Sequence, residues 1–294
     1  MASLSQWVAG ARPRTLPAAV APVVLGTAAA HLMGRADAAL GILALVVALM
    51  LQVGVNYAND YSDGIRGTDA ARVGPVRLVG QRLAAPGNVK VAAMLSFAAA
   101  GVIGLALVAL SGAWVMLPLG ALAVLAAWRY TGGDNPYGYR GLGEVYVFAF
   151  FGLMATLGTQ YTQADAVTWF GLLGAVGVGA VASAILVANN LRDIPTDTEH
   201  GKRTLAVRLG DRRTRLLYSS LIVVSVLTLA GMAFWEPWVL LGLLALPLAV
   251  RAVRTVASGT TGRELVPVLV ATGLYEVGYA VLAALGVVIG VALA

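Results

Sequence analysis

Long apolar runs constrain this chain more than any other feature. The run from Ala39 to Val55 is broken only by Gln52, and several other stretches also approach 20 residues. Such a run can cross a bilayer as a helix, and none of the runs alternates in polarity as membrane β-strands do. Hydrophobic residues make up 59% of the chain and charged residues only 12%, against about 25% charged in soluble domains. These features predict an all-α polytopic membrane protein, with residues 1–294 forming one domain and one helical bundle.

The apolar runs predict nine membrane-spanning helices. The first run follows Arg12 and Arg14 and resembles a secretory signal peptide in outline. Because Pro13, Pro17 and Pro22 interrupt it, we expect it to be retained as the first helix. The nine predicted ranges are 15–33, 39–58, 90–110, 113–131, 144–163, 167–190, 214–234, 237–255 and 265–292.

The basic residues predict how these helices are oriented. With nine spans, every Lys and Arg except Arg35 falls in the N-terminal tail or in an even-numbered connection. Those segments all lie on one side of the membrane, and loops rich in Lys and Arg face the cytoplasm. The predicted protein is therefore a multi-pass protein of the cell membrane. Its N-terminus is cytoplasmic, its C-terminus lies on the other side, and its polar loops face the cytoplasm.

Several kinds of chemistry are excluded by composition. The chain has no cysteine, which rules out disulfides, zinc–thiolate sites and a cysteine nucleophile. Its two histidines, His31 and His200, lie too far apart in the sequence to suggest a histidine metal site. The net charge of +6 follows from the basic cytoplasmic loops, so we expect no nucleic-acid partner.

A polar stretch, residues 56–82, follows the second predicted helix. Asp60, Asp63 and Asp69 lie within ten residues, and Arg72, Arg77 and Arg82 follow them. Mg²⁺ binds oxygen ligands, often one or two carboxylates together with substrate phosphates, and arginine grips phosphate oxygens bidentately. The stretch therefore predicts a metal-bridged phosphate ester bound at a membrane face. A solvated loop with balanced charges is the alternative.

A second polar stretch, residues 189–210, repeats this pattern. Asn59 and Asp63 recur as Asn189 and Asp193, and Asp197 follows one helical turn later. Pro195 lies between the two acids and predicts that the helix ends or bends there. Each stretch follows a long apolar run on the same side of the membrane. The repeat predicts two related halves whose acidic motifs hold two Mg²⁺ ions and one diphosphate at the cytoplasmic face.

The motifs resemble those of a known family. N-D-Y-S-D at Asn59–Asp63 and D-I-P-T-D at Asp193–Asp197 resemble the paired motifs of the UbiA-type intramembrane prenyltransferase superfamily. Four further segments are similar to its 1,4-dihydroxy-2-naphthoate polyprenyltransferase branch, which serves menaquinone biosynthesis. These are R-P-R-T-L-P, R-V-G-P-V-R-L, P-Y-G-Y-R-G-L-G-E and G-K-R-T-L-A-V-R-L-G. One departure is Gly67, which occupies the position where the broader family often has its third acid.

The resemblance implies a reaction and a set of partners. A polyprenyl diphosphate would bind with the cofactor Mg²⁺, ionise to an allylic cation and prenylate 1,4-dihydroxy-2-naphthoate with loss of CO₂. The implied work of the protein is to stabilise the diphosphate, exclude water and hold the ring. No covalent nucleophile is required. The lipid bilayer is a further partner, and the oligomeric state stays open.

Each candidate residue has an expected role. We expect Asp60, Asp63, Asp193 and Asp197 to be catalytic metal ligands, with Asp69 as a further metal ligand and Lys202 as a further catalytic residue. The diphosphate is expected to contact Asn59, Arg72, Arg77, Arg140, Asn189, Lys202 and Arg203. The acceptor ring or the cation is expected to contact Arg12, Arg14, Gln52, Asn56, Tyr137 and Tyr139.

Structural explanations compete with these roles. Buried asparagines can join helices, basic residues can anchor loops on the cytoplasmic side, and tyrosines can sit at the membrane interface. We expect Arg212, Arg213 and Arg215 to be anchors. Glu276 lies within the last span and is a candidate without an assigned role. At the level of function, the acceptor could instead be 4-hydroxybenzoate or homogentisate, or the chain could be a secondary transporter or a membrane scaffold.

Overall fold

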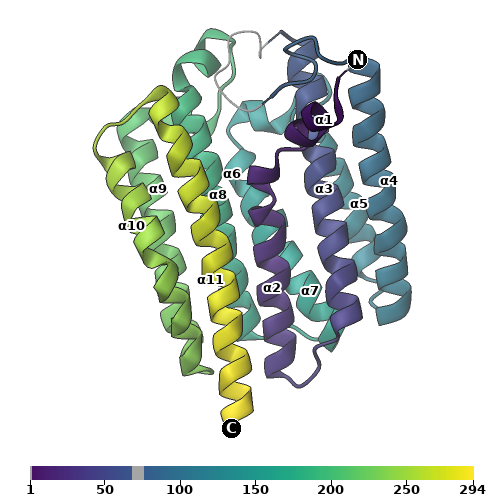
Figure 1. Ribbon diagram of the computed structural model, residues 1–294, viewed down its shortest axis with the longest axis vertical. Coiled ribbons are helices and arrows are strands. Elements are labelled where there is room, and N and C mark those ends of the chain that lie inside the picture. The colour runs from purple at the N-terminus through teal and green to yellow at the C-terminus, as the bar shows by residue number, and fades with distance from the viewer. Residues whose placement is uncertain (1, 68–75) are drawn as a thin grey trace.

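The protein is a single bundle of helices. The computed structural model describes residues 2–67 and 76–294, and these residues contain no β-strand. Most helices run along the long axis of the molecule, and the two termini lie at opposite ends (Figure 1). The all-helical prediction is confirmed.

The elements follow one another along the chain with short connections. They are α1 (Leu4–Gly10), η1 (Pro13–Thr15), α2 (Pro17–Leu32), α3 (Ala38–Ile65), α4 (Pro86–Ser111), α5 (Met116–Arg129), η2 (Tyr137–Arg140), α6 (Gly143–Val147), η3 (Phe148–Met154), α7 (Ala155–Ala164), α8 (Trp169–Glu199), α9 (Leu205–Met232), η4 (Pro237–Ala245), α10 (Leu246–Ala257), η5 (Gly262–Leu265) and α11 (Val266–Leu293). Every one of the nine predicted ranges overlaps a helical segment. Among the described residues, six helices are long and apolar enough to cross a membrane, or seven if α1, η1 and α2 form one span bent by 51°. A count of nine crossings stays a prediction.

The acidic motifs lie on helices that are longer than expected. The second predicted span ends at residue 58, whereas α3 continues to Ile65 and carries Asp60 and Asp63 on helical backbone. The sixth ends at residue 190, whereas α8 continues to Glu199. Pro195 lies inside α8, so of the predicted end or bend the end is wrong and the bend stays a prediction. Asp193 and Asp197 therefore project from one helix, about one turn apart.

Helix α8 forms the centre of the bundle. Its apolar window is 72% buried, against 17–39% for the other five long apolar helices. Small residues allow this close packing. A methyl group added at Gly152, in the π-helical segment η3, would lie 2.5 Å from the Cα of Gly179 on α8. The wide π-helical turn and α8 are therefore in backbone contact.

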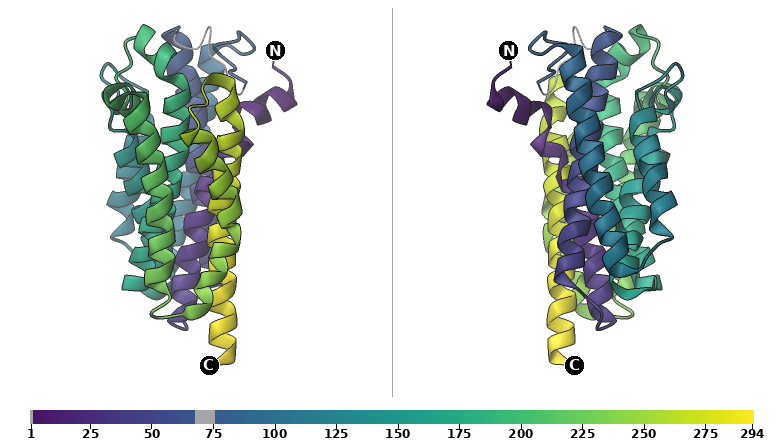
Figure 2. Two further views of the ribbon diagram at one scale, coloured as in Figure 1. Left: turned by 90° about the vertical axis from the view of Figure 1, so that its left-hand side faces the viewer. Right: turned by 90° about the vertical axis from the view of Figure 1, so that its right-hand side faces the viewer.

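The N-terminal segment crosses one end of the bundle. Helix α1 begins with a capping box at Ser3 and projects beyond the other helices (Figure 2). The hydroxyl of Tyr57 on α3 donates to the carbonyl oxygen of Trp7, and the Asn56 side chain donates to the carbonyl oxygen of Ala11. These bonds hold the turn between α1 and α2 against α3.

Candidate active site

A large cavity runs inside the bundle. Its volume is about 1410 Å³, and residues of α2, α3, α4, α5, η3, α7 and α8 line it. On α3 its lining extends from Ala44 to Asp63, which corresponds to about 28 Å of helix at 1.5 Å per residue. On α3 the lining is polar from Gln52 to Asp63, apart from Val55, and apolar from Ala44 to Leu51, and apolar residues of α2, α4 and η3 also line the cavity. One continuous space therefore joins a charged end to a long apolar wall.

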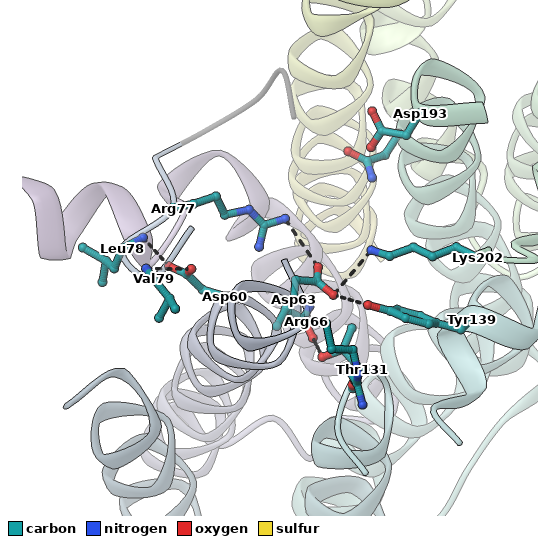
Figure 3. Close-up of polar contacts among 12 residues, drawn as sticks. Asp60, Asp63, Arg66, Arg77, Leu78, Val79, Thr131, Tyr139, Asp193 and Lys202 are labelled. Carbon is teal, nitrogen blue, oxygen red and sulfur yellow. Dashed lines mark hydrogen bonds and ion pairs between the residues drawn. The ribbon is translucent and has the colours of Figure 1, made fainter. Parts of the chain in front are cut away.

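Asp63 lies at the centre of the charged end (Figure 3). Its Oδ1 accepts a hydrogen bond from the Tyr139 hydroxyl at 2.6 Å and lies 3.4 Å from Nζ of Lys202. Its Oδ2 lies 3.9 Å from a guanidinium nitrogen of Arg77. Asp63, Arg77 and Lys202 are all buried, so each charge depends on the others for compensation.

Asp60 faces a different part of the structure. Its carboxylate accepts hydrogen bonds from the backbone N–H groups of Leu78 at 2.6 Å and Val79 at 3.2 Å. Figure 3 shows it turned toward this segment, away from Lys202 and Tyr139. Asp60 therefore holds the chain that follows the first acidic motif, and that chain carries Arg77 into the cavity wall.

In the second acidic motif, Asp193 is hydrogen-bonded to Arg192. The guanidinium group of Arg192 donates two hydrogen bonds of 2.7 Å to the carboxylate of Asp193 and a third, of 2.9 Å, to Oδ1 of Asn189. Asn189, Arg192 and Asp197 line the cavity. Sequence reasoning missed this role of Arg192, although a basic residue beside a buried acid was a signal for it.

The loop between α5 and α6 closes over the charged end. The backbone N–H of Arg203 donates to the carbonyl oxygen of Tyr139 at 3.0 Å, and Nζ of Lys202 lies 4.5 Å from the centre of the Tyr139 ring. The guanidinium of Arg66 donates to the carbonyl oxygens of Thr131 and Gly133. Arg66 thereby clamps this loop to α3, a role that the sequence pattern did not reveal.

Aromatic rings form one wall of the cavity. Tyr137 and Tyr146 stack with ring centres 3.8 Å apart, and Phe150 continues the stack at 6.0 Å from Tyr146. Burial raises the pKa of the Tyr137 phenol, and the neighbouring phenols Tyr130 and Tyr146 raise it further. The Tyr137 hydroxyl therefore stays protonated, and it donates to the carbonyl oxygen of Ala126 at 2.9 Å.

A turn near the N-terminus lines another part of the cavity. Arg12 adopts a left-handed backbone conformation with φ of 54°, which a non-glycine residue keeps only when its surroundings stabilise it. The Thr15 hydroxyl donates to the carbonyl oxygen of Arg12, and the side chains of Gln52 and Asn56 on α3 donate to Thr15. Arg12 and Arg14 both line the cavity as a result of this turn.

The structure brings most of the predicted site residues together. Those that line the cavity are Arg12, Arg14, Gln52, Asn56, Asn59, Asp63, Arg77, Tyr137, Tyr139, Asn189, Asp197 and Lys202. Asp60 and Asp193 lie beside this group but are not part of the lining, and Arg140 and Arg203 are exposed. Asp69 and Arg72 lie outside the described residues.

The side chains present fit a magnesium ion that is shared with a phosphate. Asp63 and Asp197 supply carboxylate oxygens to the cavity, and Asn59 and Asn189 supply amide groups. No three acidic or histidine side chains in the described part of the chain are gathered into a metal-binding group. Mg²⁺ commonly binds through one or two carboxylates plus substrate phosphates, so a preassembled cage of protein ligands is not required.

A second buried pair was also missed by sequence reasoning. The side-chain amide of Asn190 donates to Oε1 of Glu144 at 2.9 Å, and Ser183 donates to the Glu144 carbonyl oxygen. Asn190 lines the cavity and Glu144 lies behind it. The sequence suggested only a helix-dipole role for Glu144, because nothing in it connects positions 46 residues apart.

Comparison with known proteins gives consistent matches over most of the chain. The curated 1,4-dihydroxy-2-naphthoate octaprenyltransferase of Mycobacterium tuberculosis is 58% identical over 274 residues, covering 93% of this chain and 94% of that protein. The protein of the same name from Escherichia coli is 39% identical, covering 89% and 86%.

The solved structures that match share the fold. A UbiA homolog from Archaeoglobus fulgidus bound to DMAPP and Mg²⁺ aligns with a TM-score of 0.65 at 13% identity, covering 98% of both chains. The model of the UbiA prenyltransferase family matches residues 19–265. With this match and the relatives above, the chain belongs to the UbiA prenyltransferase family.

Proposed function

We propose that this protein transfers a polyprenyl group from an allylic polyprenyl diphosphate to 1,4-dihydroxy-2-naphthoate. The products are diphosphate, CO₂ and demethylmenaquinol, a step in menaquinone biosynthesis. The observation that carries the proposal is the cavity, which joins the buried Asp63, Arg77 and Lys202 to an apolar wall formed by α2, α4, η3 and the first half of α3. The curated relatives named for this reaction support the choice of acceptor.

The charged end of the cavity suits the diphosphate. We assign Asp63, Asp197 and the neighbouring Asn59 and Asn189 to the Mg²⁺–diphosphate complex. When bound, Mg²⁺ would neutralise charge on the diphosphate as it leaves. Arg77 and Lys202 line the same end and would add fixed positive charge there. Asp60 and Asp193 support this group through the backbone of Leu78 and through Arg192. They remain candidate ligands in the bound state.

The rest of the cavity suits the prenyl chain and the ring. Apolar side chains of α2, α3, α4 and η3 provide an extended wall for the polyprenyl tail. The aromatic wall of Tyr137, Tyr146 and Phe150 and the loop that carries Tyr139 would shield an allylic cation from water. Arg12 and Arg14 line the side where the carboxylate of the acceptor would lie.

The reaction needs no covalent intermediate with the protein. The allylic carbon–oxygen bond breaks, and its electron pair leaves with the diphosphate. The ring carbon that carries the carboxylate then forms the new carbon–carbon bond. Loss of CO₂ returns an electron pair to the ring and restores its aromaticity. The protein contributes position and electrostatics, which are the contributions that this set of side chains can make.

The location of the site follows from the distribution of basic residues. We place the charged end of the cavity at the cytoplasmic face of the cell membrane, with nine crossings and a cytoplasmic N-terminus. The segregation of Lys and Arg into the N-terminal tail and alternate connections supports this orientation. Cysteine-accessibility labelling tests it, because a cysteine placed at exposed Arg140 should react only with reagents that reach the cytoplasm.

A product assay tests the proposed reaction. Purified protein in detergent or lipid is mixed with a polyprenyl diphosphate, Mg²⁺ and 1,4-dihydroxy-2-naphthoate, with 4-hydroxybenzoate in a parallel reaction. Mass spectrometry is expected to detect a prenylated naphthoquinone without the carboxyl group, and chelation of Mg²⁺ should abolish it. Product from the benzoate alone would retain the mechanism and overturn the acceptor. No product from either ring, with folded protein, would overturn the proposed reaction.

A further inference from the structure

One amide on α8 presents a single polar atom to the cavity. Asn190 is 7% exposed and lines the cavity, and its Nδ2 donates to Oε1 of Glu144 at 2.9 Å. Its Oδ1 makes no hydrogen bond with any residue that the structure describes. Protein atoms do not enclose that oxygen, in contrast to Oε2 of Glu144, which is enclosed and also lacks a partner. Asn190 Oδ1 is therefore open to the cavity, where it can accept a hydrogen bond from a ligand.

Glu144 determines which way the Asn190 amide points. The Glu144 side chain is buried behind Asn190 and makes no ion pair with a residue that the structure describes. An ionised carboxylate only accepts hydrogen bonds, so it binds the amide through the N–H group. Rotating the Asn190 amide by 180° would place its oxygen against the carboxylate oxygen. The orientation with Oδ1 directed into the cavity is therefore the stable one.

The position of Asn190 along α8 matches the expected place of the acceptor ring. Asn190 and Asp197 are seven residues apart, so they share one face of α8 at a separation of about 10 Å along the helix. Both residues line the cavity. Helix α6 packs against α8 at this level, because a Cβ added at Gly143 would lie 3.1 Å from the Leu186 side chain. If the Mg²⁺–diphosphate complex binds at Asp197, Asn190 faces the space just beyond it, where the reacting ring must lie.

We propose that Asn190 Oδ1 accepts a hydrogen bond from a ring hydroxyl of the aromatic acceptor, and that Glu144 holds the amide in place for this contact. This inference rests on the proposed function. The hydroxyls are the only donors on a dihydroxynaphthoate, because an ionised carboxylate has none. The carboxylate is left to Arg12 and Arg14, which line another part of the cavity. A site built to bind a hydroxyl discriminates against the analogue that lacks it, because the polar oxygen is then left unpaired.

The pair of Asn190 and Glu144 would also assist the reaction. As the ring attacks the allylic cation, positive charge spreads onto the hydroxyl oxygens and makes their protons more acidic. A hydrogen bond to Asn190 Oδ1 strengthens as this charge develops, so it stabilises the transition state more than the ground state. Hydrogen bonds in a chain polarise one another, so the bond from Nδ2 to the Glu144 carboxylate makes Oδ1 a stronger acceptor. Neither side chain takes up a proton: Asn190 determines specificity, and Glu144 is a positioning residue.

Binding measurements with hydroxyl-deleted probes test the proposal independently of turnover. Full-length protein in detergent, saturated with Mg²⁺ and an unreactive thiodiphosphate analogue of the prenyl donor, is titrated calorimetrically with 1,4-dihydroxy-2-naphthoate, 1-hydroxy-2-naphthoate, 4-hydroxy-2-naphthoate and 2-naphthoate. The test variant combines Glu144→Leu with Asn190→Leu, because replacing both partners of a buried hydrogen bond by apolar groups costs less stability than removing one. This variant is expected to bind the dihydroxy compound about five- to tenfold more weakly. Its affinity for 2-naphthoate, and for the probe that lacks the recognised hydroxyl, should equal that of the wild type.

The single variant Glu144→Gln tests the positioning role. A glutamine side chain can donate as well as accept, so it no longer fixes the orientation of the Asn190 amide. Its affinity for the dihydroxy compound should fall about two- to fivefold, because part of the hydrogen bond is lost. Its affinity for 2-naphthoate should stay unchanged. Wild-type affinity of Glu144→Gln for the dihydroxy compound would overturn the role of Glu144.

A control variant separates recognition from structural damage. Gln160 carries a buried amide on α7 that bonds to Thr168, and it is not part of the cavity lining. Gln160→Leu is expected to lower the unfolding temperature and to leave the affinities of the folded protein for all four probes unchanged. The proposal is overturned if the double variant weakens every probe equally or weakens none, or if the wild type binds all four probes equally. Wild-type protein that binds the probes but forms no product would instead refute the proposed function.

Discussion

The hydroxyl of Tyr139 lies 2.6 Å from Oδ1 of Asp63 and donates a hydrogen bond to it, although 76 residues separate them. The carbonyl oxygen of Tyr139 accepts from the backbone of Arg203, and its ring lies beside Lys202. Tyr139 thus joins the end of α3, the loop after α5 and the segment after α8. The Tyr139 side chain therefore orients the Asp63 carboxylate, which we assign to the metal.

Removing the Tyr139 hydroxyl is expected to weaken metal binding. Hydrogen-bond partners of metal ligands typically contribute about 10- to 100-fold to metal affinity or activity. Tyr139→Phe should raise the Mg²⁺ concentration for half-maximal turnover at least about tenfold, because the Asp63 carboxylate loses its orienting bond. Turnover measured across a Mg²⁺ titration checks this. Tyr61→Phe, on α3 but outside the cavity lining, is the matched control. Equal metal dependence in both variants would contradict the role of Tyr139.

Lys202 is expected to act on the diphosphate rather than on the ring. Its ammonium group is buried 3.4 Å from Asp63, whereas Arg213 is an exposed basic residue on α9. A hydrogen bond to a charged group contributes about 1.5–3 kcal/mol, so Lys202→Ala should raise the KM for the prenyl diphosphate about tenfold or more. The KM for the naphthoate should stay within about twofold. Steady-state kinetics with each substrate varied in turn measures both, with Arg213→Ala as the control. A rise only in the naphthoate KM would refute the assignment.

Asp60 and Asp63 should give different defects when changed to asparagine. Asp60 accepts two backbone hydrogen bonds, from Leu78 and Val79, and an amide of the same shape retains only one acceptor oxygen. Asp60→Asn should therefore lower the thermal unfolding temperature by a few degrees and expose residues 76–84 to protease. Asp63→Asn should lose turnover with a smaller change in unfolding temperature. Thermal unfolding in detergent and limited proteolysis compare the two, and identical stability losses would be the contrary result.

The contact between η3 and α8 should tolerate no added methyl group. A Cβ at Gly152 would lie 2.5 Å from the Cα of Gly179 and 2.8 Å from the carbonyl oxygen of Ala175, and backbone atoms cannot move aside as a flexible side chain can. At Gly158, on the adjoining helix α7, the nearest atom is the Met116 sulfur at 3.5 Å, an ordinary contact. Gly152→Ala should lower the unfolding temperature and Gly158→Ala should not. Thermal unfolding of both variants tests this prediction. Equal unfolding temperatures would contradict the close backbone contact between η3 and α8.

The helical architecture was largely predictable because the bilayer imposes a simple rule on sequence. Apolar runs of about 20 residues predicted helices at nearly every place where the structure has them. The ends of α3 and α8 were less predictable. Because Asp60, Asp63, Asp193 and Asp197 are polar, the hydropathy of the sequence falls before each of these helices ends. Helices α3 and α8 continue because the bundle and its hydrogen bonds hold these acids, a contribution that hydropathy does not include.

Most of the predicted site residues line one cavity, while their roles stay predictions and several of their contacts were not predicted. Motif spacing predicted that Asp63, Asn189, Asp197 and Lys202 lie close together, and all four line one cavity. It gave no basis for Asp60 to face a backbone segment or for Asp193 to pair with Arg192. These contacts depend on side-chain direction and on how α3, α8 and the loops pack. Periodicity within one segment does not encode them.

The sequence by itself determined that this is a helical membrane protein with paired acidic motifs and the features of a prenyltransferase family. Those properties are local: they depend on run length, charge distribution and motif spacing. Only the tertiary structure decided that Gln52 Oε1 has no hydrogen-bond partner among the described residues, that Tyr139 donates to Asp63, and that η3 contacts α8 backbone to backbone. Each of these relations joins residues far apart in the chain. Their energies depend on burial and geometry that exist only once the helices have packed.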